Sequence, residues 1–210
     1  TGLKAHVLPA TEAYVACDVV LSIGGDGTML HAARFTMKYN KPLLGVNIGR
    51  LGFLTAVESD ELDKLKRLAA GDYVVEQRTV LRADISSTDE PCLALNDVVL
   101  FKDTPERTIS LDIFCDDILV SRFRGDGIIF ATATGSTAYS MSAGGPILDA
   151  RLDGIVVTQI CAQIVHTPPM EVAADRVLRA VTPSDSQAAP IVIIFHRPKT
   201  LVVGPGVHVQ

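Results

Sequence analysis

Apolar and polar positions in the first part of the chain alternate between strand-like runs and helical spacing. A short apolar run over residues 18–23 is followed by the glycine-rich stretch 24–27. From Thr28 onward, Met29, Leu30 and Ala33 recur at helical spacing until Pro42, which cannot continue a helix. Residues 43–46 form a second apolar run. The pattern predicts a strand, a glycine loop, a helix and a second strand, which together make a βαβ unit.

The next segment carries the signals of a complete helix. Ser59 stands at the N-cap position, Leu62, Leu65 and Leu68 share one face, and Gly71 follows the last turn. Acidic residues stand in the first turn and basic residues near the end, as the helix dipole favours. We therefore predict a helix between Ser59 and Gly71.

Helical spacing disappears after Tyr73, and β-branched segments recur between turn signals. The predicted strands are 74–85, 93–101, 109–115, 118–123, 127–132, 154–158, 177–181, 191–196 and 201–203. Asp116 and Asp117 occupy the position of a two-residue hairpin turn. A short helix is expected between Thr134 and Gly144. The change from helical spacing to strand-like segments predicts an α/β domain over residues 1–78 and a β-rich domain over residues 79–210.

Composition and charge exclude several classes of protein. Of the 210 residues, 48% are hydrophobic, which excludes disorder as the main state. A net charge of −5 with no Lys/Arg block argues against nucleic acid as a partner. No apolar run approaches the roughly 20 residues that span a bilayer, so no membrane partner is expected. The four scattered cysteines predict free thiols in a reducing, cytoplasmic compartment. Because the chain begins at Thr1 rather than Met, we expect a missing front end.

The first candidate site is the loop Gly24 to Thr28. Its glycines let backbone N–H groups approach an anion, and the N-terminus of the following helix adds positive potential, which suits phosphate. Asp26 would repel phosphate unless it handles a metal or a proton, and both are needed when a hydroxyl attacks a phosphoryl group. The alternative is a tight strand-to-helix turn with Asp26 as an exposed cap.

The second candidate site lies about a hundred residues later. It comprises residues 124–127 and the hydroxyl-rich stretch 134–142, whose donors could surround a sugar or phosphate while Tyr139 offers a ring face to a base. Asn96 and Asp97 lie between the two sites, inside a predicted strand, where polar groups are costly without partners. The alternatives are a hydroxyl-rich helix cap and an Asn at the end of a strand ladder.

Taken together and in this order, these motifs resemble the NAD kinase family. The matching stretches are residues 24–28, 45–55, 95–99 and 125–147. The resemblance implies a Rossmann-like N-terminal domain, truncated here, and a β-rich, sandwich-like C-terminal domain; it also implies that the chain is shortened at both ends. The implied reaction is phosphoryl transfer from ATP or polyphosphate to the adenosine ribose 2′-hydroxyl of NAD, which forms NADP.

The resemblance also implies roles for individual residues. Asp26 would take the hydroxyl proton near Mg²⁺ or another divalent cation. Gly25 and Gly27 would shape the loop and belong to the NAD-binding residues. Asp126 would address the nicotinamide end, in its own subunit or in a neighbouring subunit of a homodimer or homotetramer. The remaining NAD-binding residues would be Phe53, Asn96, Asp97, Thr137, Ala138, Tyr139 and Ser142. His196 would border the same pocket. Arg50, Arg124 and Lys102 are candidate donor-phosphate contacts by charge alone.

Two rival interpretations remain open. A non-catalytic nucleotide-binding core would bind NAD without turnover. A lipid kinase of the same superfamily would share only the first motif, and it would carry a Gly-Thr-Gly-Asn-Asp pattern that is absent after residues 43–45.

Overall fold

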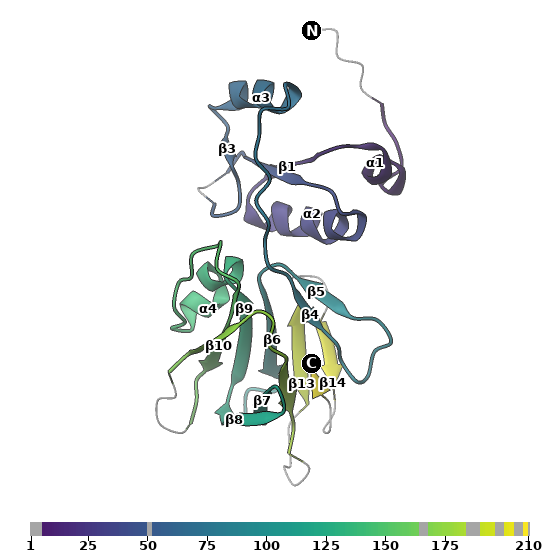
Figure 1. Ribbon diagram of the computed structural model, residues 1–210. Coiled ribbons are helices and arrows are strands. Elements are labelled where there is room, and N and C mark those ends of the chain that lie inside the picture. The colour runs from purple at the N-terminus through teal and green to yellow at the C-terminus, as the bar shows by residue number, and fades with distance from the viewer. Residues whose placement is uncertain are drawn as a thin grey trace. The chain divides into compact units, whose positions relative to one another are not determined.

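The computed structural model describes residues 6–49, 52–163, 168–183, 190–195, 200–203 and 208–209 (Figure 1). The chain divides into two compact units, 1–76 and 77–210, close to the boundary that the sequence places after residue 78. Each unit is described by itself.

The N-terminal unit is built on a three-stranded parallel sheet. Its elements are α1 (Ala10–Ala16), β1 (Val20–Gly24), α2 (Asp26–Tyr39), β2 (Leu43–Asn47), β3 (Val57–Glu58), η1 (Leu62–Lys64) and α3 (Leu65–Ala69). The strand order is β1-β2-β3, with both pairs parallel. The predicted βαβ unit is therefore confirmed. A Cβ at Gly45 in β2 would overlap Met29, so this glycine lets α2 lie close to the sheet.

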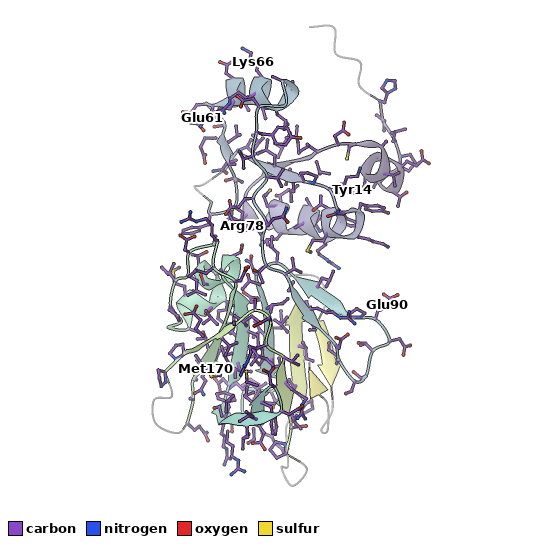
Figure 2. The ribbon with its side chains drawn as sticks, viewed as in Figure 1. Tyr14, Glu61, Lys66, Arg78, Glu90 and Met170 are labelled. Atoms are coloured by element: carbon purple, nitrogen blue, oxygen red, sulfur yellow. The ribbon has the colours of Figure 1, made fainter. Side chains whose placement is uncertain are left out.

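Helix α1 was not predicted from the sequence. It has no side-chain cap, and none of its residues is buried. Its Tyr14 stacks on two rings of α2, with ring centroids 5.6 Å from Phe35 and 5.6 Å from Tyr39 (Figure 2). Because the contact that holds α1 is tertiary, local sequence signals do not reveal it.

The helix predicted between Ser59 and Gly71 is shorter than expected. A 3₁₀ turn and the five-residue α3 replace it, and Ser59 lies in a turn rather than at an N-cap. Figure 2 labels Glu61, which precedes the 3₁₀ turn, and Lys66, which belongs to α3. The cause is β3, because Glu58 belongs to the sheet and Glu61 closes a turn onto it through Glu61 N–H to Glu58 O, 2.9 Å. The predicted end is confirmed: Gly71 has φ +73°, the left-handed conformation that glycine adopts after a helix.

The C-terminal unit is β-rich, as predicted, and its sheets are mostly antiparallel. Its elements are β4 (Leu81–Ala83), β5 (Cys92–Ala94), β6 (Asp97–Lys102), β7 (Ile109–Cys115), β8 (Ile118–Gly125), β9 (Gly127–Thr132), η2 (Thr134–Thr137), α4 (Tyr139–Ser142), β10 (Gly154–Ile160), β11 (Met170–Ala173), β12 (Leu178–Val181), β13 (Ile191–Phe195), β14 (Thr200–Val203) and β15 (His208–Val209). The sheets have the orders β11-β10-β9-β6-β13-β14, β15-β12-β7-β8 and β4-β5.

The core of this unit is a sandwich. Its larger cluster joins Ile109, Leu111 and Ile113 of the four-stranded sheet to Ile128 and other residues of the six-stranded sheet. Met170, labelled in Figure 2, packs against it from β11. A smaller cluster covers the opposite face of the six-stranded sheet. Strand β9 is consequently buried at all six positions.

The predicted hairpin between β7 and β8 is confirmed. Asp116 and Asp117 have φ +46° and +65°, which are the two left-handed residues of a type I′ turn. The turn is anchored because the Asp116 carboxylate accepts the Val177 N–H at 2.9 Å and pairs with Arg176 at 2.8 Å. These contacts support two aspartates in a conformation that glycine adopts more easily.

Other strand boundaries differ from the prediction. Of the segment 74–85, residues 81–83 form β4, and residues 73–80 have no regular secondary structure and no strand partner in the described chain. The segment 93–101 forms two strands, β5 and β6, interrupted at Leu95 and Asn96. Strands β3, β11 and β15 were not predicted. No helix among the described residues is long and apolar enough to cross a membrane.

We expect the Ile128→Ala variant to unfold at a lower urea concentration than the wild type. Ile128 is fully buried in the larger cluster, so its truncation leaves a cavity and lowers the free energy of unfolding by about 2–5 kcal/mol. Ile118→Ala is the matched control, because Ile118 is 65% exposed and its truncation should change that free energy by less than about 0.5 kcal/mol. Equal effects of the two substitutions would contradict this description of the core.

Candidate functional site

The glycine loop lies at the carboxyl edge of the parallel sheet, where β1 ends and α2 begins. Gly25 is the N-cap of α2, and its carbonyl accepts Thr28 N–H at 3.0 Å and Met29 N–H at 3.1 Å. A Cβ added at Gly25 or Gly27 would meet no atom within 4 Å, so both glycines border open space. The loop thus combines an accessible backbone with the positive end of a helix, which suits an anionic group.

Asp26 holds a second loop against this one. Its Oδ2 accepts the Phe53 N–H at 2.9 Å, and its Oδ1 accepts the Leu54 N–H at 3.0 Å. A Cβ at Gly52 would overlap the Asp26 carboxylate, so a side chain there would displace the carboxylate from its present position. Two carboxylate oxygens offer about four lone-pair sites, and the two N–H groups use two of them. Asp26 is therefore half-buried and oriented, and it keeps acceptor capacity for a proton or a cation.

The structure brings Phe53 next to Asp26. Its backbone is held by the Asp26 carboxylate, while its side chain is 72% exposed. A large apolar ring on a fixed backbone at the edge of a polar loop can stack against a base or sugar.

The N-terminal unit contains a polar pair to which the sequence analysis gave no role. Asn47 and Glu58 end β2 and β3, and the register places Gly24, Asn47 and Glu58 in one row. Asn47 is almost fully buried; its Nδ2 donates to Glu58 Oε2 at 2.9 Å and its Oδ1 accepts Gly49 N–H at 3.1 Å. The pair fixes the loop after β2. Polar residues at consecutive parallel strand ends are the signal that could have identified it.

In the C-terminal unit, Asn96 and Asp97 lie where β5 gives way to β6, and not inside one strand as predicted. Asn96 O accepts Thr132 N–H at 2.8 Å, next to the pair that Asp97 forms with Ala131, so this bond joins the chain to β9 where β6 begins. Asn96 Oδ1 is buried and has no hydrogen-bond partner within the described residues. Burial raises the pKa of Asp97 to about 6. Two desolvated polar groups side by side are unfavourable unless a ligand supplies donors.

Gly135 and Thr132 position this pair, and the sequence analysis gave neither a role of its own. A Cβ at Gly135 would overlap the Asn96 backbone, so only glycine permits this close approach. Thr132 Oγ1 donates to Leu95 O at 2.6 Å and accepts Gly135 N–H at 3.0 Å. The turn after β9 is thereby fixed against the strand break that carries Asn96.

The hydroxyl-rich turn contains two kinds of residue. Ser136 and Ser140 are fully buried and bonded inside the protein: Ser136 Oγ bridges Ala133 O and Leu148 N–H, and Ser140 Oγ lies 2.8 Å from Thr158 Oγ1. These two serines match the structural alternative of a hydroxyl-rich cap. The predicted residues Thr137, Ala138, Tyr139 and Ser142 are partly or fully exposed on η2 and α4. They lie at the same end of β9 as Asn96 and Asp97.

Asp126 lies at the other end of β9. Its backbone O accepts Lys102 N–H at 2.9 Å, and its Oδ1 pairs with Lys102 Nζ at 2.8 Å, so both candidate residues already have a partner. At roughly 3.3 Å per residue, the six residues of β9 place Thr132, at its far end, about 20 Å from Asp126. Arg124 Nε donates to Thr108 Oγ1 at 3.4 Å. Arg50 and His196 lie outside the described residues.

Comparison with known proteins identifies the family. A model of the ATP-NAD kinase N-terminal domain matches residues 6–73, and a model of the ATP-NAD kinase C-terminal domain matches residues 95–205. An NAD kinase of Moorella thermoacetica is 39% identical over 173 residues, which are 81% of this chain and 56% of that protein. An NAD kinase of Chlorobium phaeobacteroides is 36% identical over 197 residues, which are 92% of this chain and 68% of that protein.

Solved structures agree with these matches. Yeast NADH kinase complexed with NADH superposes with a TM-score of 0.84 at 27% identity, covering 96% of this chain and 60% of that one. An NAD kinase from Archaeoglobus fulgidus in complex with ATP has a TM-score of 0.76 at 27% identity, covering 91% of this chain and 73% of that one.

The chain spans 56% to 68% of the length of the two curated relatives named above. The family models nevertheless match segments of both compact units, and the glycine loop and the Asn96–Asp97 pair lie inside the matched residues. On this evidence the chain belongs to the NAD kinase family.

Proposed function

We propose that this protein transfers a phosphoryl group from ATP, or from polyphosphate, to the adenosine ribose 2′-hydroxyl of NAD, forming NADP. The observation that carries the proposal is the position of Asp26: an oriented carboxylate with spare acceptor capacity stands at the N-terminus of α2, between two glycines that border open space. The family supplies the reaction, and the bound ATP and NADH of the two solved relatives supply the substrate classes.

The acceptor nucleotide would bind to polar groups of the C-terminal unit. Asn96 and Asp97 would accept hydrogen bonds from ribose hydroxyls. These bonds would compensate for the loss of water around Asn96 Oδ1 and the Asp97 carboxylate. The exposed Tyr139 ring suits the face of an adenine. Phe53 would line the adenosine side, and Thr137, Ala138 and Ser142 would surround the adenine and its ribose.

Transfer would proceed by in-line attack. The 2′-oxygen forms a bond to the terminal phosphorus as the bond to the leaving phosphate breaks, and Asp26 accepts the hydroxyl proton on a lone pair that Phe53 and Leu54 do not use. The two backbone donors fix the carboxylate in place. Positioning and proton acceptance therefore come from this chain, with no covalent intermediate.

A divalent cation such as Mg²⁺ would support the reaction. Among the described residues, no group of three or more His, Cys, Asp or Glu side chains could hold a metal. Mg²⁺ often binds through one or two carboxylates together with substrate phosphates, so a single oriented Asp26 fits this mode. When bound, the ion would neutralise charge on the donor phosphates.

The separation of Asp126 from the other residues supports an oligomeric enzyme. Because Asp126 lies at the far end of β9 from Asn96 and Asp97, it would reach a nicotinamide bound to a neighbouring subunit of a homodimer or homotetramer. We also propose a cytoplasmic location, since the free cysteines suit a reducing compartment. Both family models describe NAD kinases, which disfavours the lipid kinase alternative.

Asp26→Asn should abolish most of the turnover while NAD still binds. The amide cannot accept the hydroxyl proton, so we expect kcat to fall by about 10²- to 10⁴-fold, with the Kd for NAD within about threefold of the wild type. NADP formation from NAD, ATP and Mg²⁺ would be followed with an NADP-specific dehydrogenase.

Asp60→Asn is the matched control, since Asp60 is exposed and lies outside the loop. Circular dichroism would verify the fold of each variant, because Asp26 also holds residues 53 and 54. Normal turnover by Asp26→Asn would contradict the role of Asp26. Tight NAD binding by the wild type with no NADP would favour the non-catalytic core.

NAD binding should strengthen as the pH rises through the range below about 6. Burial raises the pKa of Asp97 to about 6, and hydroxyl donors from the ligand would favour the ionised form, so binding releases a proton. We expect the affinity to rise by up to about tenfold per pH unit below pH 6 and to level off above it. Asp97→Asn should remove this dependence. Calorimetric titration between pH 5 and pH 8 would measure it, and an unchanged slope in the variant would contradict the assignment.

A further inference from the structure

The C-terminal unit contains a cavity that the proposed reaction does not use. It measures about 350 Å³, at the lower end of the roughly 300–1,000 Å³ range of small-molecule sites. It lies between the segment 79–84, which includes β4, and the segment 174–178, which leads into β12. The volume suits a compact ligand of one ring or a short chain rather than a dinucleotide.

The cavity is on the opposite face of β6 from Asp97. Val98, Phe130 and Ile155 form its floor and belong to the larger core cluster, whereas Val99 belongs to the smaller one. Because successive side chains of a strand point to opposite faces, Asp97 shares its face with Val99. A molecule in the cavity is therefore separated from the Asn96–Asp97 pair by the thickness of the sheet.

Two arginines line the cavity, and each of them is paired with one carboxylate. Among the described lining residues, Arg82 and Arg176 stand against a single carboxylate, Asp84. Asp84 accepts Nε and Nη2 of Arg82, each at 3.0 Å, and Asp116 pairs with Nε of Arg176 at 2.8 Å. A guanidinium has five N–H donors, so each arginine keeps donors that can bind an anion.

We infer that this cavity is a binding site for a small organic anion with an apolar body, such as a short aliphatic or aryl carboxylate. The apolar part would cover the floor formed by Val98, Phe130 and Ile155. The carboxylate would lie at the rim and receive N–H donors from Arg82 and Arg176. The inference does not depend on the proposed phosphoryl transfer, because it uses none of the same residues.

Octanoate is the probe for the test, with octanol as its neutral counterpart. Titration of the full chain, followed by two-dimensional amide NMR, should give saturable shifts at Ala83, Val98 and Ala174. We expect octanol to bind about tenfold more weakly, since it offers no charge to the arginines. Saturating NAD should leave the octanoate shifts in place. Absence of saturable binding, or displacement by NAD, would overturn the inference.

Three variants separate the cavity from nonspecific binding. Arg176→Gln should weaken octanoate binding about tenfold. Arg122→Gln removes the same charge from a side chain that is 78% exposed and does not line the cavity, so it should bind octanoate like the wild type. Ala174→Trp fills the cavity without removing a charge, so it should abolish octanoate binding. Because this variant keeps Arg176 and its contact with Asp116 of the hairpin, its effect cannot come from loss of that contact. Undiminished binding by Ala174→Trp would overturn the inference.

Discussion

The pairing of β9 with β6 and β10 is the interaction on which the C-terminal unit depends. All six residues of β9 are buried, with Ile128 and Phe130 facing the larger cluster and Ile129 and Ala131 facing the smaller one. The backbone of such a strand must be paired on both edges, because unpaired N–H and C=O groups in a core are costly. The six-residue registers with β10 and the five-residue register with β6 meet this requirement. Because all of β9 is buried, the polar candidate residues lie near its two ends.

Candidate residues lie at both ends of this strand. The two ends differ in whether their polar side chains have partners. At one end, Asp126 has an ion pair with Lys102. At the other end, Asn96 and Asp97 are desolvated, and Asn96 Oδ1 has no partner within the described residues. The chain accepts this unfavourable arrangement because Gly135 and Thr132 fix it in place. An arrangement that lowers stability and is held rigidly is the expected form of a ligand site.

The sequence predicted those elements whose signals are local. The apolar run of β9 and the two-residue hairpin are each determined by neighbouring residues, and both were confirmed in place. The glycine stretch was confirmed as the connection between strand and helix, but α2 begins at Asp26 and not at Thr28 as predicted. Prediction failed where tertiary contacts decide. Helix α1 depends on the stacking of Tyr14, the helix at Ser59 is shortened by β3, and the segment 73–80 is β-branched but has no strand partner in the described chain. The break at Asn96 depends on Gly135, which is distant in sequence.

The residues of the candidate site also divide into those with local sequence signals and those that only the fold brings together. The chemistry of Asp26 could be inferred from its glycine neighbours, but its two backbone partners, Phe53 and Leu54, come from a loop that only the fold brings close. The residues of the cavity carry no motif at all, because an apolar floor and two arginines are unremarkable until segments 79–84 and 174–178 lie side by side. Alternation along β6 then gives one strand two chemically different faces, with Asp97 on one side and Val98 on the other.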